Sequence, residues 1–132
     1  LRVMWVGARE ALRSENPDRS RHVVFSLREL ITHTLHALAP DDAIQNWTND
    51  QSLFHNGRPT RKARVLYICR EINHDPFTSF IRADVKASIE FINLFQRGHE
   101  LAMSFSEKQL ETLVTRAEAF LRLLILAHRT TE

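Results

Sequence analysis

The sequence predicts an all-α fold, a bundle of about five main helices with mostly antiparallel neighbours. Glycine is scarce, at three of 132 residues, and no run of alternating apolar and polar residues is flanked by hairpin turns. Apolar residues instead recur at the spacing i, i+3, i+4, i+7, which places them on one face of a helix. Both observations favour helices around one core over a sheet.

The first half of the chain contains three of the expected helices. One runs from about Val3 to Arg13. Asn16 can cap the next helix and Pro17 fits its first position, so this helix is expected to run to about Leu38. Its expected core-facing residues are Val23, Val24, Leu27, Leu30, Ile31, Thr34, Leu35 and Leu38. A short helix follows and ends near Trp47.

A polar loop is expected over residues 48–60, because Asn, Asp, Gly and Pro are concentrated there. Loops of this kind often contain functional residues. Thr60 can cap a helix that runs from Arg61 to about Ile72. The loop therefore lies between two predicted helices.

Two longer helices complete the predicted bundle. Asp75 can cap the first of them, Pro76 begins it and Gly98 ends it. Ser106 and Gln109 have the spacing of a capping box, which opens the final helix. Short connections between such helices imply antiparallel neighbours.

Length and composition predict one folded domain. The chain has 132 residues, 43% hydrophobic and 26% charged, which is typical of a globular protein and excludes a disordered one. Its apolar runs are too short to span a membrane, and no secretory signal is present, so we expect a cytoplasmic protein. Because the chain begins at Leu1 in a helical pattern, we expect residues 1–132 to be a C-terminal piece of a longer protein whose upstream domain is missing. Cys69 is the single cysteine, which excludes an internal disulfide.

Basic residues cluster in one segment of the chain. The net charge is only +2, from 18 basic and 16 acidic residues, so it does not by itself require a nucleic-acid partner. Between positions 58 and 70, however, there are five basic residues and no acidic residue. They are Arg58, Arg61, Lys62, Arg64 and Arg70. The segment predicts a surface that binds phosphates, with a solvated helix face beside a basic loop as the alternative.

The stretch "RELITHTLH" contains the candidate catalytic pair, Arg28 and His33. Histidine exchanges protons near neutral pH, and the planar, permanently charged guanidinium of arginine suits a phosphate. On a helical wheel Glu29, His33 and His36 share an edge opposite the apolar face, whereas Arg28 lies well round the helix. His36 is therefore a candidate substrate-binding residue. The alternative is that Arg28 pairs with an acid and His33 is merely solvated.

Two other constellations compete with this pair. Glu29, His33 and His36 offer one carboxylate and two imidazoles, but three ligands on one straight helix rarely surround a metal, so we expect neither metal nor cofactor. Arg70 and His74 share a helix face with Tyr67. We expect His74 to cap the end of its helix rather than to react.

The separation of Arg28 and His33 by four residues, on a long helix of a helical domain, resembles the HEPN superfamily. Members are helical bundles, commonly dimers, and often endoribonucleases with an Arg-x(4 to 6)-His motif at the dimer interface. This chain has Glu29 after the arginine, where members favour Asn, Asp or His.

The wider sequence, "NPDRSRHVVFSLRELITHTLHALAPDD" and "LFHNGRPTRKARVLYICREINHDPF", looks like the C-terminal helical region of bacterial predicted pPIWI-associating nucleases. These proteins are linked to anti-phage defence. The likeness spans most of residues 7–125 and implies a nuclease context.

Together the two resemblances imply a homodimer that cuts RNA without a metal and has no membrane partner. The alternative is a non-catalytic helical module for dimerisation or sensing, attached to an upstream nuclease or effector. The two alternatives differ in whether a second copy brings Arg28 and His33 together.

Overall fold

The computed structural model describes Val6, Glu10, residues 19–100 and residues 105–129. Five α-helices account for most of these residues, which confirms the predicted all-α bundle. They are α2 (Arg19–Leu38), α3 (Asp41–Trp47), α4 (Arg61–Ile68), α5 (Thr78–Glu100) and α6 (Glu107–Arg129). Val6 and Glu10 are helical, but the rest of the helix predicted over residues 3–13 lies outside the described residues. The cap predicted at Asn16 and Pro17 also lies outside them.

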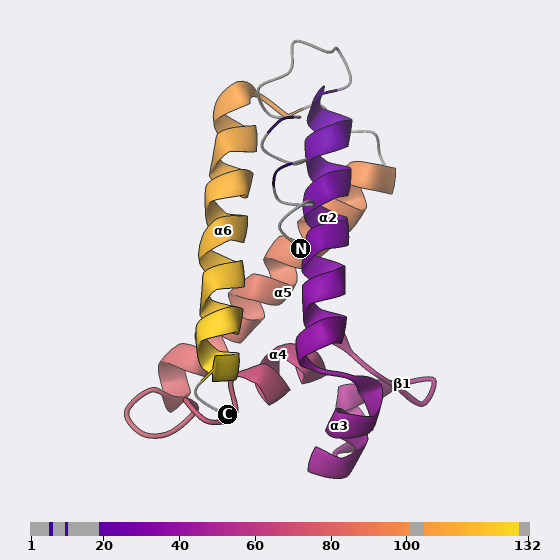
Figure 1. Ribbon diagram of the computed structural model, residues 1–132, viewed down its shortest axis with the longest axis vertical. Helices are drawn as coiled ribbons and strands as arrows, with labels where there is room; N and C mark the ends of the chain where they lie inside the picture. Colours follow the sequence, from indigo (N-terminus) through magenta and orange to yellow (C-terminus); the bar gives the residue numbers. More distant parts are fainter. Residues whose placement is uncertain (1–5, 7–9, 11–18, 101–104, 130–132) are drawn as a thin grey trace.

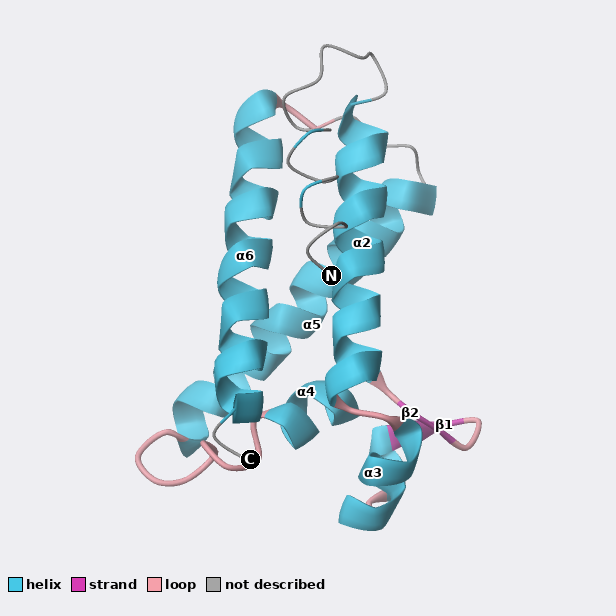
Figure 2. Ribbon diagram, in the orientation of Figure 1, coloured by secondary structure: helices cyan, strands magenta, loops and turns pink. Residues whose placement is uncertain are grey.

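The three long helices form the body of the molecule (Figure 1). Helices α2 and α6 stand side by side and run in the same direction, and α5 crosses behind them in the opposite direction. This arrangement arises because α5 carries the chain back before α6 begins. Helix α4 lies across one end of the bundle, and α3 extends beyond the carboxyl end of α2 (Figure 2). Helix α2 packs against α4, α5 and α6, so it is the central element of the core.

The apolar face of α2 is buried as its spacing predicts. Seven of the eight expected core positions are almost inaccessible to solvent, and Leu38 is partly buried. Thr34 is buried too, and its hydroxyl donates a hydrogen bond to the Leu30 carbonyl at 2.8 Å, so no donor is left unpaired there. Phe95 of α5 and Phe120 of α6 are the largest fully buried side chains that complete this core.

The predicted caps of α4 and α6 are present. The Ala63 amide donates to the Thr60 hydroxyl at 3.1 Å. At the start of α6 the Gln109 amide donates to Ser106 Oγ at 3.2 Å, and the Ser106 amide donates to Gln109 Oε1 at 2.8 Å. These are the two reciprocal bonds of a capping box, so local sequence alone placed both helix starts correctly.

The ends of α4 and α5 differ from the prediction. Helix α4 ends at Ile68 rather than near Ile72, and the chain turns through the following residues. Helix α5 begins at Thr78, two residues after the cis Asp75–Pro76 bond, and continues past Gly98 to Glu100. A single glycine lowers helix propensity by about 1 kcal/mol, which is too little to end a long helix.

The expectation that the chain has no sheet needs one correction, a small hairpin inside the loop of residues 48–60. A 3₁₀ turn (Gln51–Leu53) leads into β1 (Phe54–His55), which pairs antiparallel with β2 (Arg58–Pro59). Asn56 and Gly57 both have positive φ, of 51° and 76°, as the central residues of a type I′ hairpin turn require. The Asn-Gly dipeptide was the sequence signal for it.

Candidate functional site

The exposed face of α2 is the surface on which the predicted catalytic residues lie. It carries the exposed residues Arg21, His22, Phe25, Thr32, His33 and His36, with Glu29 half-buried among them. The face lies opposite the stripe that packs against α4, α5 and α6. Its side chains therefore point away from the core of this copy.

Arg28 and His33 occupy opposite margins of this face. Five residues of helix turn one side chain by about 140° relative to the other, with Arg28 on one side of His36 and His33 on the other. The His33 side chain is 60% exposed, and its Nε2 lies 3.7 Å from Glu29 Oε2. Arg28 is half-buried beside the apolar stripe. One copy of the chain thus does not bring the two side chains together.

His36 lies at the carboxyl end of the same face, in a positive environment. Partial burial lowers the pKa of His36 below its ordinary value of 6.5, and the nearby charge of Arg64 lowers it further, while Asp41 opposes them. The ring is therefore neutral at physiological pH. A neutral imidazole can accept a hydrogen bond or a proton, so His36 suits contact with a hydroxyl better than contact with a phosphate.

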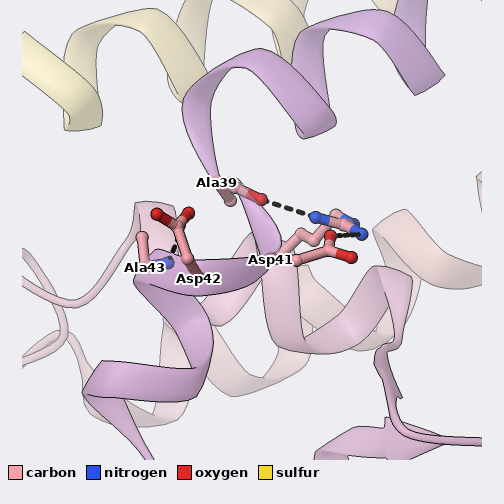
Figure 3. Close-up of polar contacts among 5 residues, drawn as sticks. Ala39, Asp41, Asp42 and Ala43 are labelled. Carbon is pink, nitrogen blue, oxygen red and sulfur yellow. Dashed lines mark hydrogen bonds and ion pairs between the residues drawn. The ribbon is translucent and has the colours of Figure 1, made fainter.

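Arg64 is part of the fold rather than of an exposed phosphate-binding surface. It is only 4% exposed, and its Nη1 donates to the Ala39 carbonyl at 2.5 Å. Its Nη2 donates to Asp41 Oδ1 at 2.6 Å, and Figure 3 shows the Ala39 carbonyl and the Asp41 carboxylate directed at one guanidinium. These bonds give the Ala39 carbonyl, at the end of α2, a hydrogen-bond donor, and they join this end to α3 and α4. The position of Arg64 in the basic segment could not reveal this, because both acceptors are more than 20 residues away in sequence.

We predict that Asp41→Asn lowers the free energy of unfolding by about 1 kcal/mol at neutral pH, since the 46% exposed carboxylate loses its charge-assisted bond. The hydrogen bond from Arg64 lowers the pKa of Asp41 below its ordinary value of 3.8. The bond therefore stabilises the protein above the unfolded-state pKa, and this stability is lost as the pH falls through the folded-state pKa.

Urea unfolding from about pH 7 to about pH 3 measures the effect. The difference between wild type and Asp41→Asn should shrink toward the acid end of this range. The exposed Glu111 of α6 supplies a control, Glu111→Gln, which should behave like wild type. A deficit of Asp41→Asn that is unchanged in acid would show that the carboxylate charge is not its cause.

Three other predicted phosphate-binding residues lie in the hairpin and at the start of α4. Arg58 is exposed in the hairpin, opposite His55. Arg61 and Lys62 are exposed at the start of α4, and Arg61 Nη1 donates to Asn93 Oδ1 of α5 at 3.3 Å. The hairpin and the start of α4 thus present three exposed positive charges.

Arg70 lies just beyond the end of α4 and contacts Tyr67 of that helix. Its guanidinium lies 3.9 Å from the centre of the Tyr67 ring, and its Nη1 donates to the Tyr67 carbonyl at 2.7 Å. Trp47 contacts the same ring edge to face, with centroids 5.5 Å apart. Arg70 therefore contacts a carbonyl at the end of α4. His74 was expected to cap this helix, but α4 ends at Ile68 and the His74 side chain is exposed.

A pocket between α4 and α5 brings Lys62, a predicted phosphate-binding residue, together with residues that the sequence did not single out. Its volume is about 640 Å³. The lining comprises Lys62, Leu66, Asn73, Arg82, Val85, Lys86, Ile89 and Glu90. The spacing of Arg82, Lys86 and Glu90 by four residues was visible in the sequence. What remained hidden was that α4 supplies the facing wall.

A second, polar pocket of about 400 Å³ lies between α3 and the hairpin. Its lining includes Asn56 and Gly57, two residues of the loop that was expected to be functional. None of its lining residues is charged, so it lacks the positive side chains of the pocket between α4 and α5.

The described side chains form neither a cluster of metal ligands nor a reactive thiol. Within the part of the chain that the structure describes, no group of three or more His, Cys, Asp or Glu residues is placed to hold a metal ion. Cys69 is buried, and burial raises the pKa of its thiol to about 11, with a smaller contribution from Asp84. The thiol is therefore protonated at neutral pH and unreactive. None of the described helices is both long and apolar enough to cross a membrane.

Comparison with known proteins identifies the family. No curated protein and no solved structure matches the chain significantly. A model of the family described as "Predicted pPIWI-associating nuclease" matches residues 1–124. This match covers nearly the whole chain and agrees with the resemblance noted in the sequence. The chain belongs to the family of predicted pPIWI-associating nucleases.

Proposed function

We propose that this chain is a HEPN-like domain of a bacterial anti-phage defence protein and cuts RNA without a metal, as a homodimer. The observation that carries the proposal is the exposed face of α2, with Arg28 at one margin and His33 at the other. Membership of a predicted nuclease family supports a nucleic-acid substrate. An RNA substrate and the absence of a spanning helix among the described residues both accord with a cytoplasmic location.

The proposed chemistry uses the 2′-hydroxyl of RNA as the internal nucleophile. Its oxygen bonds to the adjacent phosphorus while the bond from phosphorus to the 5′-oxygen breaks, which leaves a 2′,3′-cyclic phosphate and a 5′-hydroxyl. His33 takes the proton from the nucleophile or supplies one to the leaving oxygen, and Glu29 at 3.7 Å holds the ring. Arg28 stabilises the charge that builds on the phosphorus-bound oxygens.

A second copy completes the proposed site. A two-fold axis parallel to α2, in front of its exposed face, places the same surface of both copies in contact. In that arrangement Arg28 at one margin faces the partner's His33 at the other, and the pair that one copy separates by about 140° becomes one site. Two such sites form for each dimer.

A non-catalytic module for dimerisation or sensing is the second candidate. The observation in its favour is the same separation, because Arg28 and His33 do not meet within one copy. Labelled single-stranded RNA incubated with the wild-type chain in EDTA distinguishes the two candidates. Intact RNA in the presence of a folded dimer would favour the module.

We predict that light scattering at micromolar concentration gives twice the 15.4 kDa mass of one chain. Thr32→Arg should shift the mass to one chain, because it places a long charged side chain near the centre of the exposed α2 face. The matched control is Thr112→Arg on the exposed side of α6, which should stay dimeric. A wild-type monomer would contradict the proposed dimer.

A further inference from the structure

The pocket between α4 and α5 combines positive charge with an apolar wall. Lys62 from α4 and Arg82 and Lys86 from α5 contribute three positive charges, against one negative charge from Glu90. Leu66, Val85 and Ile89 form the apolar part of the lining. A bound molecule would therefore meet both an anion-binding side and a surface suited to a flat, weakly polar ring.

Asn73 adds an unsatisfied polar atom at this pocket. It lines the pocket, and its Oδ1 is shielded from solvent without a hydrogen-bond partner in the described part of the chain. Buried side-chain oxygens nearly always have a partner, so an orphaned one calls for an explanation. We infer that a ligand with an N–H group in the pocket supplies the missing donor, which requires the Asn73 amide to turn toward the pocket.

The dimensions fit one nucleotide. Arg82 and Glu90 are eight residues apart on α5, so the lining extends about 12 Å along the helix. The bond between Arg61 and Asn93 ties α4 to α5 one turn beyond Glu90 and holds that side of the pocket together. A volume of about 640 Å³ accommodates a base, a sugar and one phosphate.

We propose that this pocket binds a nucleoside monophosphate, either free or as the terminal nucleotide of a single-stranded nucleic acid. Lys86, Arg82 and Lys62 bind the phosphate, the base lies against Leu66, Val85 and Ile89, and Asn73 Oδ1 accepts a hydrogen bond from the base. The pocket lies outside the exposed face of α2. Binding there therefore does not depend on RNA cleavage by Arg28 and His33.

Isothermal titration of the full chain with adenosine 5′-monophosphate and with ribose 5-phosphate tests the proposal. The second probe keeps the phosphate and sugar but lacks the base. We expect saturable binding of the nucleotide and weaker binding of ribose 5-phosphate. Short 2′-O-methyl oligoadenylates, with and without a 5′-phosphate, resist cleavage through the 2′-hydroxyl. They show whether the bound nucleotide is free or is the end of a nucleic-acid chain. If the phosphorylated oligomer binds and the free nucleotide does not, the ligand of the pocket is the end of a nucleic-acid chain. If the free nucleotide binds, the ligand is a small molecule.

Two variants and one control connect the binding to the pocket. Lys86→Glu should weaken binding of the nucleotide by about tenfold or more, since it replaces a favourable charge with a repulsive one. Asn73→Ala should weaken binding of the nucleotide but not of ribose 5-phosphate. Lys108→Glu, at an exposed site on α6, should bind as wild type does.

Circular dichroism shows that each variant is folded before it is compared. No saturable binding of either the nucleotide or the oligomer by folded wild type would overturn the proposal. Equal affinity for ribose 5-phosphate and the nucleotide would also overturn it, and so would wild-type affinity in Lys86→Glu.

Discussion

Replacement of His33 by alanine is expected to leave the fold intact and to reduce RNA cleavage by about a hundredfold or more, the usual contribution of a general acid or base. The fold should survive because the His33 side chain is 60% exposed and contacts Glu29 rather than the core. Cleavage should fall because His33 is the proposed proton-transfer group. EDTA should change the wild-type rate little, since the proposed chemistry needs no metal.

His22 provides the matched control for this prediction. It is another exposed histidine on the same face, about three turns earlier on α2. His22→Ala should cleave labelled single-stranded RNA at the wild-type rate in a time course with both variants checked by circular dichroism. Equal cleavage by His33→Ala and wild type would assign the activity to another site or to a contaminant.

Leu30→Ala is expected to lower the free energy of unfolding by about 2–5 kcal/mol, the largest stability effect that we predict. Leu30 is 2% exposed and lies on α2, which packs against α4, α5 and α6. Truncation removes buried apolar surface and leaves a cavity that those helices cannot easily fill. Chemical denaturation monitored by circular dichroism measures the loss.

The same substitution at an exposed leucine isolates the effect of burial. Leu126 of α6 is 62% exposed, and Leu126→Ala should change stability by less than about 0.5 kcal/mol. A loss below about 1 kcal/mol for Leu30→Ala would mean that the core of α2 is assigned to the wrong face.

Features that depend on neighbouring residues in the sequence were predictable. The α2 stripe around Leu30 and the Ser106–Gln109 capping box each follow from residues within one or two turns of helix. The predicted ends of the helices that stop at Ile68 and continue past Gly98 were less accurate. Packing against other helices decides where these helices end, and the local sequence does not reveal it.

The candidate sites were only partly predictable, because they depend on contacts between distant segments. The wheel separated Arg28 from His33 correctly, since both lie on one helix. The burial of Arg64 by Ala39 and Asp41 depends on how α4 crosses the end of α2. The pocket lined by Asn73 and Lys86 likewise needs α4 and α5 side by side, and no local pattern encodes that arrangement.

The charge pattern of residues 58–70 shows the same limit. The sequence predicted a phosphate-binding surface over this segment, but helical geometry directs neighbouring side chains of α4 to different sides. Arg64 turns inward, whereas Lys62 turns toward the pocket shared with α5. Arg64 and Lys62 are therefore close in sequence but have different surroundings.

A mixed-dimer assay tests most directly the claim that two copies form each RNA-cutting site. Arg28→Ala and His33→Ala are purified separately, shown to be nearly inactive, and then unfolded and refolded together. If each site takes Arg28 from one copy and His33 from its partner, about half of the dimers are mixed and each mixed dimer has one intact site. The mixture should then recover about a quarter of the wild-type cleavage rate. A mixture that remains as inactive as either variant alone, although light scattering shows dimers, would contradict the composite site.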